Sequence, residues 1–139
     1  MDARDGYILR ISKDEWLSQV YDLRKYYSGV MRHWDKGTVI LLVKKAEEGD
    51  SFIGYGVVDK VEKTAEMSPE EKDYCLRNNW RCALSFDELK RFPRPFPIKR
   101  SLLAEDPRKG SYLHGVKLSW KVINHILEDA DAYQSSSGT

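Results

Sequence analysis

The six residues from Phe92 to Pro97 read Phe-Pro-Arg-Pro-Phe-Pro, and they restrict the fold more than any other stretch of this chain. Proline fixes its own φ angle and has no backbone N–H, so it cannot donate a hydrogen bond within a sheet. Because Pro93, Pro95 and Pro97 alternate, the segment is held extended and is excluded from the interior of a sheet. We therefore expect an extended segment here that lies outside the sheet interior.

The same region is strongly basic. From Lys90 to Lys109 there are seven Lys or Arg and two acidic residues, a local charge of +5, whereas the other 119 residues carry −4. A cationic segment with interleaved aromatic residues suits a surface that binds a polyanion. We predict that five of its residues contact phosphates: Arg94, Lys99, Arg100, Arg108 and Lys109.

Length and composition indicate a single globular domain, since 139 residues suffice to bury a core and 41% of them are hydrophobic. We expect one domain over residues 1–133 and a polar, disordered tail over residues 134–139. The longest apolar run, Val39–Val43, is too short to cross a bilayer, and Met1–Asp5 lacks a signal-peptide apolar region. These features predict a cytoplasmic protein without a membrane partner.

Cys75 and Cys82 are the only cysteines of the chain. Neither belongs to a CxxC pair or to a Cys/His cluster, which are the patterns of zinc and dithiol sites. We expect two reduced thiols, and neither a metal nor a cofactor.

The first part of the chain alternates short elements. Tyr7–Ile11 is an apolar run typical of a buried strand. Ser12–Glu15 reads as a capping box that begins a helix. Tyr26–Gly37 is predicted to be a linker with two glycines.

A β-hairpin is predicted after this linker. The β-rich segments Thr38–Val43 and Phe52–Val61 flank a polar turn at Glu47–Asp50. Gly54 and Gly56 of the second strand indicate a bulge or the close approach of another group.

The C-terminal half contains two serine caps. Ser68 followed by Pro69 predicts the start of a helix, and Ser119 predicts the start of the last helix. Between them, Tyr74–Phe86 has apolar residues at a period of two in its second half, so a strand is expected there. The whole pattern is that of an α+β fold.

The order of these parts resembles the PUA-like superfamily, nearest to its EVE domains and more distantly to the YTH domains that read methylated adenine in RNA. The resemblance covers roughly Tyr7 to Asp129. Four segments carry it: the opening strand and helix Tyr7–Trp16, the loop Tyr26–Val30, the glycine-containing strand Phe52–Val58 and the closing helix Leu118–Leu127. Where EVE domains commonly have Pro-Gly-Asp, this chain has Trp34-Asp35-Lys36-Gly37.

The resemblance implies a small, strongly bent, mixed β-barrel flanked by helices, with a pocket that takes one flipped, modified base. A flipped base is stabilised by stacking on aromatic side chains, at about 1–3 kcal/mol for each base. We expect Trp16 and Trp120 in the core, and Tyr27 and Trp34 foremost in the pocket. The predicted base-binding residues are Tyr26, Tyr27, Ser28, Trp34, Tyr55, Asn79 and Trp80.

The sequence thus predicts a non-enzymatic module that binds a modified, for example methylated, base in DNA or RNA, and it leaves the polymer open. No serine or cysteine stands at nucleophile spacing to His33 or His114. Two alternatives remain. One is an amidohydrolase of acylated nucleosides, as in the related ASCH domains, using Lys36, Thr38 and Glu47. The other is a protein-interaction module that presents the proline-rich run.

Overall fold

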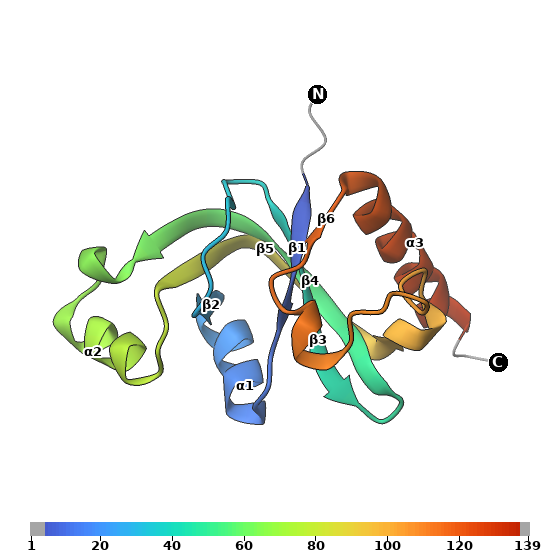
Figure 1. Ribbon diagram of the computed structural model, residues 1–139, viewed down its shortest axis with the longest axis horizontal. Helices are drawn as coiled ribbons and strands as arrows, with labels where there is room; N and C mark the ends of the chain where they lie inside the picture. The colour runs from blue at the N-terminus through green and yellow to red at the C-terminus, as the bar shows by residue number, and fades with distance from the viewer. Residues whose placement is uncertain (1–4, 137–139) are drawn as a thin grey trace.

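The computed structural model describes residues 5–136 and confirms the expected α+β fold (Figure 1). Its elements in chain order are β1 (Gly6–Arg10), α1 (Asp14–Leu23), β2 (Lys25–Ser28), β3 (Val39–Ala46), β4 (Gly49–Lys63), the 3-10 helix η1 (Thr64–Glu66), α2 (Pro69–Arg77), β5 (Cys82–Pro97), the 3-10 helices η2 (Ile98–Arg100) and η3 (Gly110–Leu113), β6 (Lys117–Leu118) and α3 (Trp120–Ser136).

The strands form one mixed sheet in the order β2-β5-β4-β3-β1-β6. Strands β1 and β3 are parallel, and every other neighbouring pair is antiparallel. The order ends at β2 and β6, so the described strands form an open sheet and do not close into the expected barrel. The edge strands have only four and two residues, which leaves little backbone with which the two edges could pair.

The β4–β5 hairpin is long and curved, and it carries η1 and α2 at its far end (Figure 1). Its register shifts three times, which is the signature of bulges that bend a sheet. Gly54 and Gly56 of β4 permit close packing against β5. A side chain at Gly54 would meet the carbonyl oxygen of Lys90, and one at Gly56 would meet the ring of Phe86. The predicted close approach is confirmed.

The proline run lies in the second half of β5. Strand β2 pairs only with Cys82–Ser85, so the prolines lie where β5 has β4 as its single neighbour. Phe92 and Phe96 are buried in the core, whereas Pro93 and Pro95 are exposed. The prediction of an extended segment outside the sheet interior is confirmed.

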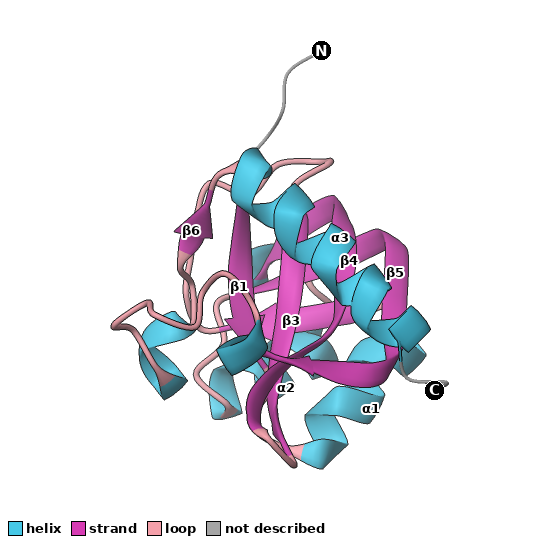
Figure 2. Ribbon diagram, turned by 90° about the vertical axis from the view of Figure 1, so that its right-hand side faces the viewer, coloured by secondary structure: helices cyan, strands magenta, loops and turns pink. Residues whose placement is uncertain are grey.

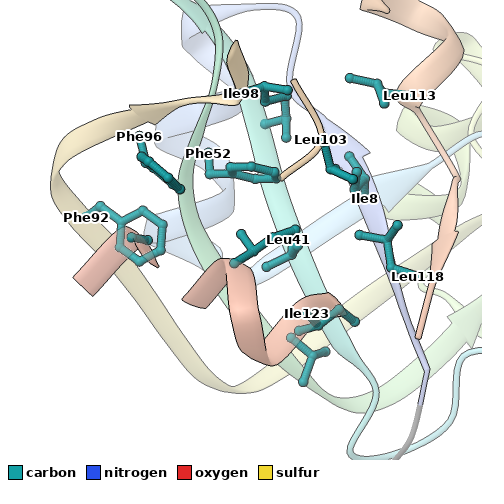
Figure 3. Close-up of a cluster of buried hydrophobic side chains, with 14 residues drawn as sticks. Ile8, Leu41, Phe52, Phe92, Phe96, Ile98, Leu103, Leu113, Leu118 and Ile123 are labelled. Atoms are coloured by element: carbon teal, nitrogen blue, oxygen red, sulfur yellow. The ribbon is translucent and has the colours of Figure 1, made fainter. Parts of the chain in front are cut away.

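Both faces of the sheet are buried. Helix α3 crosses one face, where Ile8, Leu41 and Phe52 pack with Ile123 (Figures 2 and 3). Helix α1 packs against the other face, over residues such as Leu42. A strand covered on both faces is apolar at successive positions, which accounts for the run Val39–Val43 in β3.

Two predicted elements are wrong in extent. The segment expected to be a linker, Tyr26–Gly37, begins as strand β2, and the segment expected to be a strand, Tyr74–Phe86, begins as the end of α2. The Ser68 cap and Pro69 start α2, which continues to Arg77 before a turn leads to β5. Local helix signals therefore outweigh the alternating pattern in this stretch.

Helix starts follow two of the three predicted caps. The Ser68 hydroxyl accepts the Glu71 amide at 3.2 Å, and the Ser119 hydroxyl accepts the Val122 amide at 3.3 Å. The capping box at Ser12 does not form. Instead α1 begins one residue later in the chain, with Lys13 at the N-cap position.

The C-terminal tail was expected to begin at residue 134, but α3 continues through Ser136. Gln134 fixes this last turn, because its side chain accepts the Arg94 amide at 2.9 Å and donates to the Arg94 carbonyl at 2.7 Å. Residues 137–139 of the predicted tail lie outside the described residues. Within residues 5–136, no helix combines the length and apolar character needed to cross a membrane.

Candidate functional site

A pocket of about 250 Å³ lies where α1, β2, the turn before β5 and η3 meet. Aromatic side chains make up much of its wall: Trp16, Tyr26, Tyr27 and Trp80. Pockets for drug-sized ligands usually measure about 300–1,000 Å³, so this one suits a smaller molecule.

Three of the aromatic rings pack against one another. Tyr27 and Trp80 are stacked, with ring centroids 5.3 Å apart and planes 11° apart. Trp16 meets Trp80 edge to face at 5.1 Å. Because they come from α1, β2 and the turn after α2, these rings join three elements into one wall of the pocket.

The tyrosine hydroxyl groups bind the protein itself. Tyr26 donates to the backbone carbonyl of Arg10, and Tyr27 donates to the Glu71 carboxylate at 2.6 Å. Burial raises the pKa of both phenols, and for Tyr27 the hydrogen bond to Glu71 raises it further. Both rings are therefore neutral at physiological pH and fixed in orientation.

His114 forms a polar end of the pocket beside β1. Its Nδ1 accepts the Arg10 backbone N–H at 3.0 Å. Burial lowers the pKa of His114, and the positive charges of Arg10 and Arg32 lower it further. The imidazole is therefore neutral at pH 7.

Three further polar side chains line the pocket: Ser12, Gln19 and Ser111. Because the helix starts after Ser12, its hydroxyl is not used as a cap. Gln19 donates to the Tyr74 hydroxyl at 2.6 Å, which leaves its carbonyl oxygen as an acceptor.

The structure brings together only some of the predicted base-binding residues. Tyr26, Tyr27 and Trp80 line the pocket. Ser28 is buried, and its hydroxyl bonds to both backbone polar groups of Val30, so it shapes the loop beside the pocket.

Trp34 is a core residue, which corrects its predicted place in the pocket. It is 5% exposed and meets Tyr7 edge to face with ring centroids 5.5 Å apart. The glycine-containing loop around Trp34 suggested exposure, but the loop folds back so that the indole ring packs on the α1 face of the sheet.

Tyr55 and Asn79 also lie outside the pocket lining. The Tyr55 hydroxyl faces Glu88 at 3.5 Å, beside the proline-containing half of β5. Asn79 adopts a left-handed conformation, with φ at 59°, in the turn that leads to Trp80. Its carbonyl approaches Gly29 so closely that a side chain there would be crowded. Asn79 thus positions the pocket wall through its backbone.

Sequence reasoning missed six polar or aromatic lining residues: Arg10, Ser12, Trp16, Gln19, Ser111 and His114. Trp16 and Gln19 are spaced three residues apart in α1, a signal of one shared helical face. Trp16 was expected in the core; it is half-buried and serves both the core and the pocket. No sequence signal connects Ser111 and His114 with the first 30 residues.

The predicted phosphate-binding residues do not form one continuous set. Arg94 packs over the Tyr133 ring at 3.8 Å and donates to the Tyr133 carbonyl at 2.8 Å, so it fastens α3. Arg108 pairs with Asp106 at 2.7 Å and holds the pKa of that carboxyl at about 2. Both guanidinium groups are thus engaged within the protein, and their contact with phosphates stays a prediction.

The remaining three basic residues are exposed. Lys99 and Arg100 both approach Glu48, at 3.6 and 3.0 Å. Lys99 and Lys109 line a second cavity together with Gly110 of η3. Since η3 also supplies Ser111 to the pocket, the two lysines lie on the η3 side of it.

The residues of the hydrolase alternative are not brought together. Thr38 directly precedes β3 and Glu47 directly follows it, so they lie at opposite ends of an eight-residue strand. Lys36 pairs instead with Asp59 at 3.6 Å. These three side chains do not form one site.

Comparison of the chain with models of known protein families and with curated proteins finds no match.

Proposed function

We propose that this chain is a nucleic-acid-binding module whose aromatic pocket takes one modified base flipped out of DNA or RNA. The observation that carries the proposal is the pocket itself, in which four aromatic side chains and a neutral histidine surround a space of about 250 Å³. Such a site offers ring faces for stacking and polar groups for the edge of a planar ligand.

The energetics of base flipping favour this kind of site. Removing a base from its stack costs a few kcal/mol. Stacking on aromatic side chains restores about 1–3 kcal/mol for each base, and hydrogen bonds to the base edge contribute further. Because Tyr26 and Tyr27 are already fixed by their hydroxyl groups, little side-chain order is lost when a ligand binds.

We further propose that the fold is of the PUA-like type with its sheet left open. The support is the position of two segments on which the resemblance rests. The opening segment Tyr7–Trp16 and the loop Tyr26–Val30 both contribute residues to the pocket lining. The order of these segments in the sequence and their meeting at one pocket are two independent observations, and both support the proposal.

The bound nucleic-acid strand would leave the pocket along η3. Tyr112 is 79% exposed and stands between the pocket residue Ser111 and the core residue Leu113. An exposed aromatic ring beside a base pocket is a platform for the neighbouring base. Lys99 and Lys109 supply positive charge on the same side.

The test is a titration with single-stranded and duplex DNA and RNA, each with and without modified bases, comparing Trp80→Ala with Trp120→Ala. Trp120 is the matched control because it is a half-buried tryptophan outside the pocket. It packs against the hydrophobic core between α3 and the sheet. We expect Trp80→Ala to lower the affinity for the preferred oligonucleotide roughly tenfold or more. Trp120→Ala should leave that affinity unchanged.

Thermal melting of both variants separates binding from folding. Retained affinity in a folded Trp80→Ala variant would rule out the pocket as the base site. Equal binding of modified and unmodified strands by the parent protein would rule out recognition of the modification.

A further inference from the structure

The hydrogen bonding of His114 fixes which of its two nitrogens is a donor. Nδ1 accepts the backbone N–H of Arg10, so it carries no proton. In a neutral imidazole the proton then resides on Nε2. His114 is neutral at pH 7 because burial and the charges of Arg10 and Arg32 disfavour protonation.

The Nε2 atom is open to a ligand. Among the described residues it has no hydrogen-bond partner, and it is not one of the enclosed polar atoms without a partner, which are Arg10 Nε, Trp34 Nε1 and Arg94 Nε. Since His114 lines the pocket, its accessible N–H is a donor that a bound molecule can meet.

The two charged groups that shift the pKa of His114 are both positive. The guanidinium groups of Arg10 and Arg32 both lower its pKa, and Arg10 is neutralised in part by Asp50 at 2.7 Å. No carboxylate belongs to the described lining of the pocket. An N–H donor beside positive charge attracts an acceptor and repels an amino group.

On the basis of the proposed function, we infer that His114 is a specificity-determining residue whose Nε2–H selects a base with an exocyclic carbonyl oxygen, such as guanine, over adenine. The exocyclic group of adenine is an amine, which would place a donor against the His114 donor. A buried donor left without an acceptor loses the hydrogen bond and keeps its desolvation cost.

The test uses two variants that separate the two nitrogens. In His114→Asn the side-chain oxygen occupies the position of Nδ1 and can still accept the Arg10 amide, but nothing replaces Nε2. In His114→Gln the amide nitrogen occupies the position of Nε2 and restores a donor. The probes are short single-stranded DNAs that differ only in one central base: guanine, adenine, or 2-aminopurine, which has hydrogen in place of the carbonyl oxygen of guanine and lacks the N1–H.

We expect the parent protein to bind the guanine probe about three- to tenfold more tightly than the 2-aminopurine probe, which is the range for one neutral hydrogen bond. That ratio should fall to about one in His114→Asn and be kept in His114→Gln, and thermal melting of both variants establishes that each is folded. Adenine should bind no better than 2-aminopurine.

A guanine preference that persists in folded His114→Asn, or a parent protein that prefers adenine, would overturn the inference. The outcome for the proposed function is read separately from Trp80→Ala. If binding depends on Trp80 but not on His114, only the inference fails; if neither these probes nor the oligonucleotides with modified bases bind the parent protein, both fail.

Discussion

Trp34 shows why a residue type does not determine a role. Its indole ring is buried against Tyr7, and its Nε1 donor is enclosed without a partner among the described residues. An aromatic ring in a loop thus stabilises the α1 face of the sheet, while Trp80, in a short turn, lines the pocket.

We therefore expect Trp34→Ala to lower the free energy of unfolding by about 3–5 kcal/mol, because it leaves a large cavity. Trp34→Phe should cost less than about 1.5 kcal/mol, since it keeps most of the packing and removes the unpaired donor. Urea unfolding measures both changes. Normal oligonucleotide affinity in Trp34→Phe would agree with a purely structural role, whereas a loss of affinity in this folded variant would contradict it.

At the scale of elements, a carboxylate of α2 binds the pocket wall. Glu71 accepts the Tyr27 hydroxyl at 2.6 Å and pairs with Lys25 at 3.0 Å. The same tyrosine ring stacks on Trp80. The far end of the β4–β5 hairpin therefore supports the pocket through Glu71.

The Tyr27 hydrogen bond, followed by Lys25, holds the pKa of Glu71 below its usual value. A carboxyl whose pKa is lower in the folded state stabilises that state above its unfolded pKa of about 4.3. This contribution is lost as the pH falls through the lower, folded pKa. Stability should thus decline in acid in a way that depends on Glu71.

We expect Glu71→Ala to lower the free energy of unfolding by about 1–3 kcal/mol at neutral pH and to flatten its decline below about pH 4.3. Glu70→Ala is the matched control, because Glu70 is exposed in the same helical turn. It should change stability by less than about 0.5 kcal/mol. Denaturant titrations at several pH values make the comparison, and equal effects of the two variants would show that the Glu71 contacts are unimportant.

At the scale of the whole molecule, the basic surface residues differ in the contacts that they make within the protein. Arg94 and Arg108 are engaged in contacts that hold α3 and the loop before η3. Lys109 is exposed beside the pocket, although its amine also reaches the Ala104 carbonyl at 2.8 Å. The proposed path of the nucleic-acid backbone therefore runs along η3.

Lys109→Ala should weaken binding to all oligonucleotides alike and reduce the slope of log affinity against log salt concentration by about one. Lys121→Ala is the matched control, since Lys121 is exposed on α3 and changes the net charge equally. Titrations at several salt concentrations decide the matter. Identical slopes for the two variants would mean that Lys109 contributes only to the overall charge.

Much of the fold is determined by local sequence. The Ser68 and Ser119 caps, the turn at Glu47–Asp50 and the edge position of the proline run depend on backbone geometry and on hydrogen bonds within a few residues. Such features can be predicted because no distant part of the chain changes them. Predictions failed where two local patterns competed, as in Tyr74–Phe86.

The pocket depends on contacts that no local pattern contains. Tyr26, Tyr27 and Trp80 were predicted by type, but their association depends on the pairing of β2 with β5. His114 accepts a hydrogen bond from Arg10, a residue 104 positions away, because β1 lies next to η3 and β6 at the sheet edge. Packing of distant segments also placed Trp34 in the core and bound Arg94 to α3. The sequence by itself determined which groups are available for stacking, donation and charge; only the tertiary structure decided which of them share one pocket, because that depends on free energies of burial and pairing summed over the whole chain.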